Sequence, residues 1–215
     1  MLQVLLLVTL ATAQVPVPTR PPVPEGWQVR LDDVSMQAGK APATAAAGVV
    51  DFVVMKPGWH VTTGPSAILY QSASQASGLY SVKAETFLFD PETRNEAYGV
   101  LIGGRNLEGA DQAYTYFVIR RSGEFLIKRR TGPTTTNVRD WTAHTAIRKW
   151  DERSADERSV RNILEVQVAA DSAAFLVNGQ EVARVPTRDI DTNGVVGLRI
   201  NHHLNLHVSG LAIGT

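Results

Sequence analysis

The sequence contains no cysteine among its 215 residues, which excludes a disulfide framework, a thiolate zinc site and a cysteine nucleophile together. It also has no excess of charge of either sign, because 21 basic residues balance 21 acidic ones. No global field therefore attracts a nucleic-acid backbone or an anionic membrane surface, and neither partner is predicted. Any bound metal ion needs histidine, carboxylate or carbonyl ligands.

Long apolar runs are missing too, and the run at the N-terminus is too short to cross a bilayer core of about 30 Å. Residues 1–13, MLQVLLLVTLATA, place that run before a small-x-small pattern, which predicts a signal peptide and a secreted or periplasmic protein. A buried hydrophobic strand is the alternative interpretation of residues 1–13. Residues 14–26 contain five prolines and predict an extended linker. The folded domain is therefore expected over residues 27–215.

Apolar residues recur with period two from Trp27 onward, and turn residues interrupt them about every 8 to 12 positions. This pattern predicts an all-β fold, an antiparallel β-sandwich with two sheets packed face to face. Tight hairpin turns are predicted at Ser122-Gly123 and Asn178-Gly179. Residues 148–162 are dense in charge and offer no apolar face, so we expect a solvated loop with at most one short helix there.

Three of the five histidines lie in GLRINHHLNLHVSG, residues 197–210. The apolar residues of this stretch alternate with His203 and His207, which predicts a strand with its histidines turned outward. On one strand these two histidines lie roughly 13 Å apart, too far to ligate one zinc ion together. We therefore predict surface histidines and no metal cofactor. His202, in the preceding turn, remains a candidate ligand.

Asp189 and Asp191, in RDIDTNG, provide oxygen ligands close together in the sequence. Such oxygens can hold a calcium ion at a sheet edge. The same residues suit a turn before Gly194, which is the preferred interpretation. A calcium site is the alternative.

Two stretches carry a resemblance to a known family. LEVQVAADSAAFLVNGQEVARV, followed by GVVGLRINHHLNLHVSGLAI, resembles the C-terminal half of the concanavalin-like jelly rolls in the 3-keto-disaccharide hydrolase domain family. YTYFVIRRSGEFLIKRR is similar to paired strands of that family. The resemblance covers roughly residues 27–213. It implies a concanavalin-like jelly roll in an exported protein that binds carbohydrate, with cleavage of 3-keto-glycosides in some members.

Cleavage of a 3-keto-glycoside requires a base that removes the acidic proton next to the ketone. The catalytic candidates are Glu96 and His144. The chain lacks the E-x-D-x-x-E strand that places two carboxylates on one face in the related family-16 glycanases. Classical glycosidase action is therefore not predicted, and whether the protein is an enzyme stays open.

Aromatic rings stack on the apolar faces of sugars, and charged side chains hydrogen-bond their hydroxyls. The hairpin at Ser122-Gly123 is predicted to set Tyr116 opposite Arg129 and Phe117 opposite Lys128. A core or loop-anchoring role is the alternative for Trp59 and Trp141, and packing is the alternative for Tyr116. The predicted ligand-binding residues are Trp59, His60, Tyr98, Tyr116, Arg129 and Trp141.

Three functions follow from these observations. The preferred one is binding of carbohydrate or a small glycoside, because the domain is simple and the glycanase motif is missing. Hydrolysis or elimination of a keto-glycoside is the first alternative. A structural protein-interaction domain of the cell envelope is the second.

Overall fold

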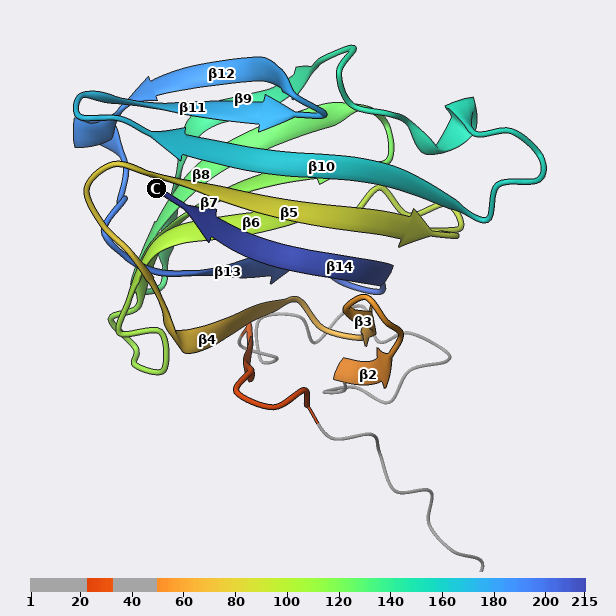
Figure 1. The fold of residues 1–215 in the computed structure, drawn as a ribbon, viewed down its shortest axis with the longest axis horizontal. Helices are drawn as coiled ribbons and strands as arrows, with labels where there is room; N and C mark the ends of the chain where they lie inside the picture. The colour runs from red at the N-terminus through yellow and green to blue at the C-terminus, as the bar shows by residue number, and fades with distance from the viewer. Residues whose placement is uncertain (1–22, 33–49) are drawn as a thin grey trace, which may run out of the picture.

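The computed structural model describes residues 23–32 and 50–215, which form two seven-stranded antiparallel sheets packed face to face. Figure 1 looks onto the second of them, sheet B, with strands of the first, sheet A, behind it. The predicted antiparallel β-sandwich is confirmed. The predicted signal peptide and residues 14–22 of the predicted linker lie outside the described residues.

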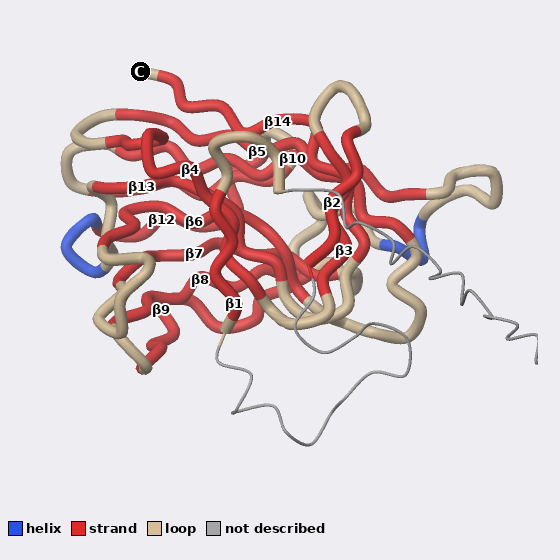
Figure 2. The backbone as a smooth tube through the Cα atoms, turned by 90° about the horizontal axis from the view of Figure 1, so that it is seen from below, coloured by secondary structure: helices blue, strands red, loops and turns tan. Residues whose placement is uncertain are grey.

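Sheet A carries strands from both halves of the chain (Figure 2). In spatial order its strands are β1 (Gln28–Leu31), β4 (Ala67–Ala76), β13 (Gly194–Ile200), β6 (Ala97–Arg105), β7 (Ala113–Arg120), β8 (Glu124–Thr131) and β9 (Thr134–Ala143). Sheet B runs β12 (Gln180–Pro186), β11 (Ser172–Val177), β10 (Ser159–Val168), β5 (Tyr80–Phe89), β14 (Asn205–Gly214), β3 (Trp59–Thr63) and β2 (Val50–Val54).

The core lies between the two sheets, and period-two alternation along the strands fills it. In β5 every second residue is buried, beginning with Tyr80, Val82 and Ala84, while the residues between them are more exposed. The β11–β12 turn has positive φ at Asn178 and Gly179, the geometry of a tight type I′ hairpin. Both features agree with the pattern in the sequence.

The β7–β8 hairpin differs from its prediction by one residue. Arg120 pairs with Glu124, so the loop holds three residues rather than two. Every pairing shifts accordingly: Tyr116 faces Lys128, Phe117 faces Ile127, and Arg129 faces Thr115. Because neighbouring positions of a strand point to opposite faces, this shift separates Tyr116 from Arg129. The predicted pairing of these two residues is wrong.

The histidine-rich stretch is also placed differently from its prediction. His202 and His203 form the turn before β14, and His203 has a φ of +51°. His207 lies on the outward face of β14 but is only 8% exposed. The reason is that β14 is an interior strand, between β3 and β5, so neighbouring side chains cover His207.

The charged segment 148–162 is more ordered than predicted. It contains a 3₁₀ helix, η2 (Trp150–Glu152), and its last four residues already belong to β10. Trp150 is buried in the main core, where the sequence had offered no apolar face. A second 3₁₀ helix, η3 (Thr187–Asp189), precedes β13. Among the described residues, no helix has the length and apolar character needed to cross a membrane.

Candidate functional site

A groove runs along the outer face and edge of sheet A, where the β6–β7 loop folds back beside β4 and β13. Its central hollow has a volume of about 530 Å³. It continues on both sides into neighbouring hollows, sharing Gln75, Asn106 and Val195 with one and Tyr70 and Glu108 with the other. The central hollow is lined by Tyr70, Ser72, Gln75, Gly104, Asn106, Leu107, Glu108, Gly109, Asp111 and Val195.

The floor of this groove is a small apolar cluster that is separate from the main core. It consists of Ile68, Tyr70, Leu101, Leu107, Tyr114 and Val195. Leu107 brings the β6–β7 loop down onto the sheet. Arg30, from β1, then fixes the loop by donating to the carbonyl oxygens of Leu107 and Gly109, the latter at 2.7 Å.

Two further contacts shape the loop. The Asn106 side-chain amide donates to Asp111 at 2.7 Å, which closes the loop on itself. Gly103 has a φ of +65°, and a Cβ at this position lies only 2.4 Å from the backbone carbonyl of Asp191. The chain can pass this point only because glycine has no side chain.

The rim of the groove is polar and reaches solvent. Ser72, Gln75, Asn106, Glu108 and Asp111 are all exposed. Side-chain amides offer both donors and acceptors, and carboxylates offer acceptors. Such a rim is suited to a neutral ligand with many hydroxyl groups.

Tyr70 lies between the central hollow and the hollow beside β1. Burial, and then the negative charge of Glu108, raise the pKa of the Tyr70 hydroxyl above its usual value, while Arg30 opposes this rise. The hydroxyl therefore stays protonated at neutral pH. It remains able to donate a hydrogen bond into the groove.

An ion-pair network borders the groove on the same face of sheet A. Arg199 is 7% exposed and donates to both carboxylate oxygens of Asp32, at 2.9 and 2.5 Å. Arg130 approaches the same carboxylate at 3.5 Å. Gln112 accepts from Arg130 and Arg30 when its amide oxygen faces them. The network thus connects β1, the β6–β7 loop, β8 and β13.

The charges of this network hold each other ionised. Burial alone raises the pKa of Asp32, but hydrogen bonding and attraction from Arg199, with a further contribution from Arg130, bring it below its usual value. Burial likewise opposes the charge of Arg199, yet Asp32 raises the Arg199 pKa above the ordinary value. Because these groups satisfy one another, we assign them a structural role in supporting the outer face of sheet A.

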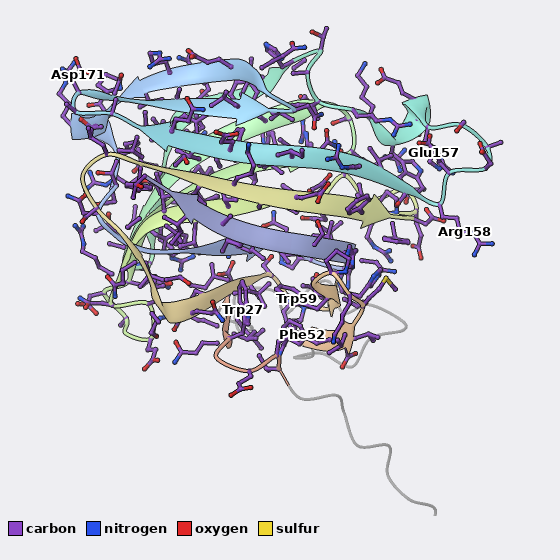
Figure 3. The ribbon with its side chains drawn as sticks, viewed as in Figure 1. Trp27, Phe52, Trp59, Glu157, Arg158 and Asp171 are labelled. Atoms are coloured by element: carbon purple, nitrogen blue, oxygen red, sulfur yellow. The ribbon has the colours of Figure 1, made fainter. Side chains whose placement is uncertain are left out.

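The predicted ligand-binding aromatics do not come together. Trp59 is buried in the main core, edge-to-face with Trp27 at 4.9 Å and Phe52 at 5.4 Å (Figure 3). Tyr98 is 1% exposed and lies in the same core between the sheets, so it has no access to a ligand. The side chains of Trp59 and Tyr98 are therefore both packed in the main core.

The other predicted residues lie in separate places. His60 is on the outer face of sheet B, whereas Tyr116 is on the outer face of sheet A. Trp141, on β9, is 37% exposed and has the guanidinium of Arg120 at 4.1 Å from its ring centre. Tyr116 and Trp141 are thus the predicted aromatics left with access to a ligand on sheet A.

The catalytic candidates are also apart from each other. Glu96 precedes β6 and faces His202 at 3.5 Å, and hydrogen bonding from His202 lowers the Glu96 pKa. His144 follows β9, where its Nδ1 accepts from the backbone N–H of Ala146 at 3.1 Å. Neither residue lines the hollows of the groove. The structure therefore does not bring these two candidates together with the predicted aromatics in the groove.

The carboxylate of Asp191 is held by two arginines. Arg105 donates to it at 2.6 Å and Arg129 at 2.7 Å, and Asp191 is nearly buried. These guanidinium groups occupy the oxygens that a calcium ion needs, while Asp189 is exposed on η3. Within residues 23–32 and 50–215, no group of three or more metal-binding side chains is assembled.

The groove residues were missed because they come from strands far apart in the sequence. The stretch GGRNLEGADQ, residues 103–112, carried a signal: two glycines followed by several polar residues, among them two amides and two carboxylates, between two apolar strands. Nothing in the sequence indicates that this loop folds onto β4 and β13. That contact depends on the strand order of sheet A.

Comparison with known proteins identifies the fold. No family model matches the chain, and no curated protein matches it by sequence. Among solved structures, it is similar to the carbohydrate-binding module CBM66 from Bacillus subtilis, with a TM-score of 0.60 and 8% identity over 88% of this chain and 96% of the module. A protein of unknown function with a galectin-like fold, also from Bacillus subtilis, gives 0.59 and 10% over 87% and 88%.

A third similar structure is a GH16 protein of the Bacteroides ovatus mixed linkage glucan PUL, in complex with its G4G4G3G product. Its TM-score is 0.59 at 7% identity, over 89% of this chain and 95% of that one. At such low identity the similarity shows the fold alone. The chain therefore has the jelly-roll architecture of these carbohydrate-binding, galectin-like and GH16 structures.

Proposed function

We propose that this protein is a carbohydrate-binding domain and that the groove on sheet A is its glycan site. The observation that carries the proposal is the hollow of about 530 Å³, with exposed amide, hydroxyl and carboxylate groups above an apolar floor that includes Tyr70. A sugar presents hydroxyl groups around a partly apolar ring. The polar rim of the groove can therefore bind the sugar hydroxyls, while the apolar floor can contact the apolar face of the sugar ring.

The charges of the groove favour a neutral saccharide over an anionic polymer. Glu108 and Asp111 line the central hollow, and Arg105 lines the adjoining one. Arg30, Arg130 and Arg199 donate to groups within the protein. The cationic side chains nearest the groove are therefore engaged, so binding should rest on hydrogen bonds to hydroxyls, with little dependence on salt.

Proteins with similar folds give additional support to this proposal, which rests on the groove itself. Two of the similar structures, with TM-scores of 0.60 and 0.56, are the carbohydrate-binding module CBM66 and the carbohydrate recognition domain of Emp46p. Export, predicted from residues 1–13, belongs to the same proposal, since extracellular glycans are the ligands that such a protein meets. The more specific resemblance to 3-keto-disaccharide hydrolase domains stays a prediction.

The test is a neutral glycan array probed with the full chain, followed by calorimetric titration of the glycans that bind. We expect Gln75→Ala and Asn106→Ala each to weaken binding about tenfold, because each removes a donor and an acceptor from the rim. Gln180→Ala is the matched control, since it removes an exposed amide from β12 on sheet B. Binding that both groove variants leave unchanged contradicts the site.

The two alternative functions are tested by separate assays on the same full chain. Release of free sugar from a 3-keto-glycoside indicates turnover, and Glu108→Gln and Asp111→Asn then test the carboxylates that line the hollow. Absence of glycan binding, together with capture of one defined protein partner, favours the structural interaction domain.

A further inference from the structure

The groove on sheet A extends well beyond its central hollow. One outer hollow, lined by Asn193, has a volume of about 600 Å³, and the other, lined by Gln28, has about 470 Å³. These are called the Asn193 hollow and the Gln28 hollow. Each is close in size to the central hollow of about 530 Å³. A pocket for one small ligand usually has about 300–1,000 Å³. The groove therefore offers three adjoining compartments, each large enough for a sugar unit.

Two β-bulges shape this part of sheet A. Residues 71–74 of β4 stand opposite the single residue Val196 of β13. On the other side of β13, Ile102 and Gly103 of β6 also stand opposite Val196. Ser72, within the bulge of β4, lines the central hollow. Bulges redirect side chains and are frequent next to functional sites, so the regular sheet is interrupted where the groove lies.

The strand register gives the length of the groove. Gln28 of β1 pairs with Tyr70 of β4, which pairs with Gly197 of β13. These two steps across the sheet cover about 10 Å, and the three residues along β13 from Gly197 to Gly194 cover about 10 Å more. Gly194 lines the Asn193 hollow. The diagonal between the two outer hollows is therefore about 14 Å. A single sugar ring is shorter than this and fills only part of the groove.

Both outer hollows repeat the polar chemistry of the centre. The side-chain oxygen of Asn193 accepts from the backbone N–H of Gly78 at 3.2 Å. The side-chain oxygen of Gln28 accepts from the Ser72 hydroxyl at 2.8 Å. Each amide is thus oriented through its oxygen, and its nitrogen carries two N–H donors suited to sugar hydroxyls.

The arginines of the outer hollows are engaged within the protein. Arg105 lines the Asn193 hollow and forms an ion pair with Asp191 at 2.6 Å. Arg30 lines the Gln28 hollow and donates to the carbonyl oxygen of Gly109 at 2.7 Å. Neutral sugar units therefore suit the outer hollows as they suit the central one.

We propose that the groove binds a linear neutral oligosaccharide of at least three units, with one unit in each hollow. This inference rests on the glycan-binding function proposed above and adds the size of the ligand. Gln75 and Asn106 line both the central and the Asn193 hollow, while Tyr70 and Glu108 line both the central and the Gln28 hollow. Each of these junctions is placed to contact two neighbouring units of the chain.

The experiment is a calorimetric titration of the full chain with oligosaccharides of increasing length. The probes are the single sugar to the hexamer of the neutral glucan, xylan, mannan, galactan and fructan series. We expect one oligosaccharide per chain. In the series that binds, the affinity should rise about tenfold with each unit up to the trimer, because each unit adds hydrogen bonds in a further hollow. From trimer to hexamer it should change less than about threefold.

Variants of the outer hollows test where the additional units bind. Gln28→Ala and Asn193→Ala should each lower the affinity for the trimer about tenfold, so that the trimer binds about as tightly as the dimer binds to the unaltered chain. Gln180→Ala is the matched control, since it removes an exposed amide from sheet B, and should leave the affinity for the trimer unchanged.

A measurement on the unaltered chain does not depend on the folding of any variant. In saturation-transfer NMR, protons of all three units of the trimer should receive saturation from the protein. Saturation confined to one terminal unit overturns the proposal.

The outcomes separate this inference from the proposed function. If the single sugar binds as tightly as the trimer, while Gln75→Ala and Asn106→Ala still weaken binding, the glycan site stands and the proposed ligand length is wrong. If none of the five series binds, the proposed function fails, and the inference about ligand length fails with it.

Discussion

Replacing Asp32 by alanine should destabilise the protein far more than replacing an exposed carboxylate. The substitution leaves Arg199 without its partner, and the side chain of Arg199 is only 9% exposed. Removing one member of a buried ion pair costs about 3–5 kcal/mol. The Asp32 side chain is 24% exposed, so solvent screens part of the interaction and we expect the lower end, about 3 kcal/mol. For a domain of this size, that corresponds to a drop in Tm of about 6–12 °C.

Chemical denaturation at neutral pH measures this effect. Asp171→Ala is the matched control, because Asp171 is exposed in the β10–β11 turn (Figure 3) and its side chain forms no ion pair within the described part of the chain. We expect the control to change the free energy of unfolding by less than about 0.5 kcal/mol. A loss below about 1 kcal/mol for Asp32→Ala refutes the view that this pair is shielded from solvent.

The same carboxylate predicts a dependence on pH with a defined sign. The folded-state pKa of Asp32 is lowered, against the effect of burial, by Arg199 and Arg130. Its stabilising contribution is therefore present above the unfolded-state pKa of about 3.9 and is lost as the pH falls through the lower folded-state value. The difference in unfolding free energy between the natural protein and Asp32→Asn should consequently shrink below about pH 4. A difference that stays constant there argues against the assignment.

Two further predictions concern the packing around the groove and the charged segment. Gly103→Ala should lower the unfolding free energy by at least about 2 kcal/mol, because the new Cβ meets the Asp191 carbonyl at 2.4 Å. Gly179→Ala is the comparison, because Gly179 also has a positive φ but has open space around it. This second substitution should lower the unfolding free energy by only about 1 kcal/mol. Equal losses in urea denaturation contradict the close approach at Gly103. Trp150→Ala should cost about 3–5 kcal/mol, since Trp150 is buried in the main core. A change below about 1 kcal/mol, measured by the same method, shows that η2 does not contribute to that core.

Periodicity explains why the fold was predictable and the site was not. The alternation of buried and more exposed residues in β5 indicates which face of the strand is buried, and it does so whichever strand lies beside it. The function of an outward side chain depends instead on its neighbours in the sheet. Tyr116 and Arg129 illustrate this dependence, because one additional loop residue moves them to opposite faces. Trp59 and Tyr98 illustrate it as well, since an aromatic residue suits a core as well as a ligand site.

The sequence by itself determined the all-β class, the Asn178-Gly179 turn and the alternation of Leu204, Leu206 and Val208, because each follows from local backbone geometry. Tertiary structure decided which strands are neighbours. Strand order brings the β6–β7 loop onto β4 and β13, which creates the groove, and places β14 between β3 and β5, which sets His207 against His60. Such contacts join residues from about 30 to almost 150 positions apart, and no local pattern encodes a pairing over that distance.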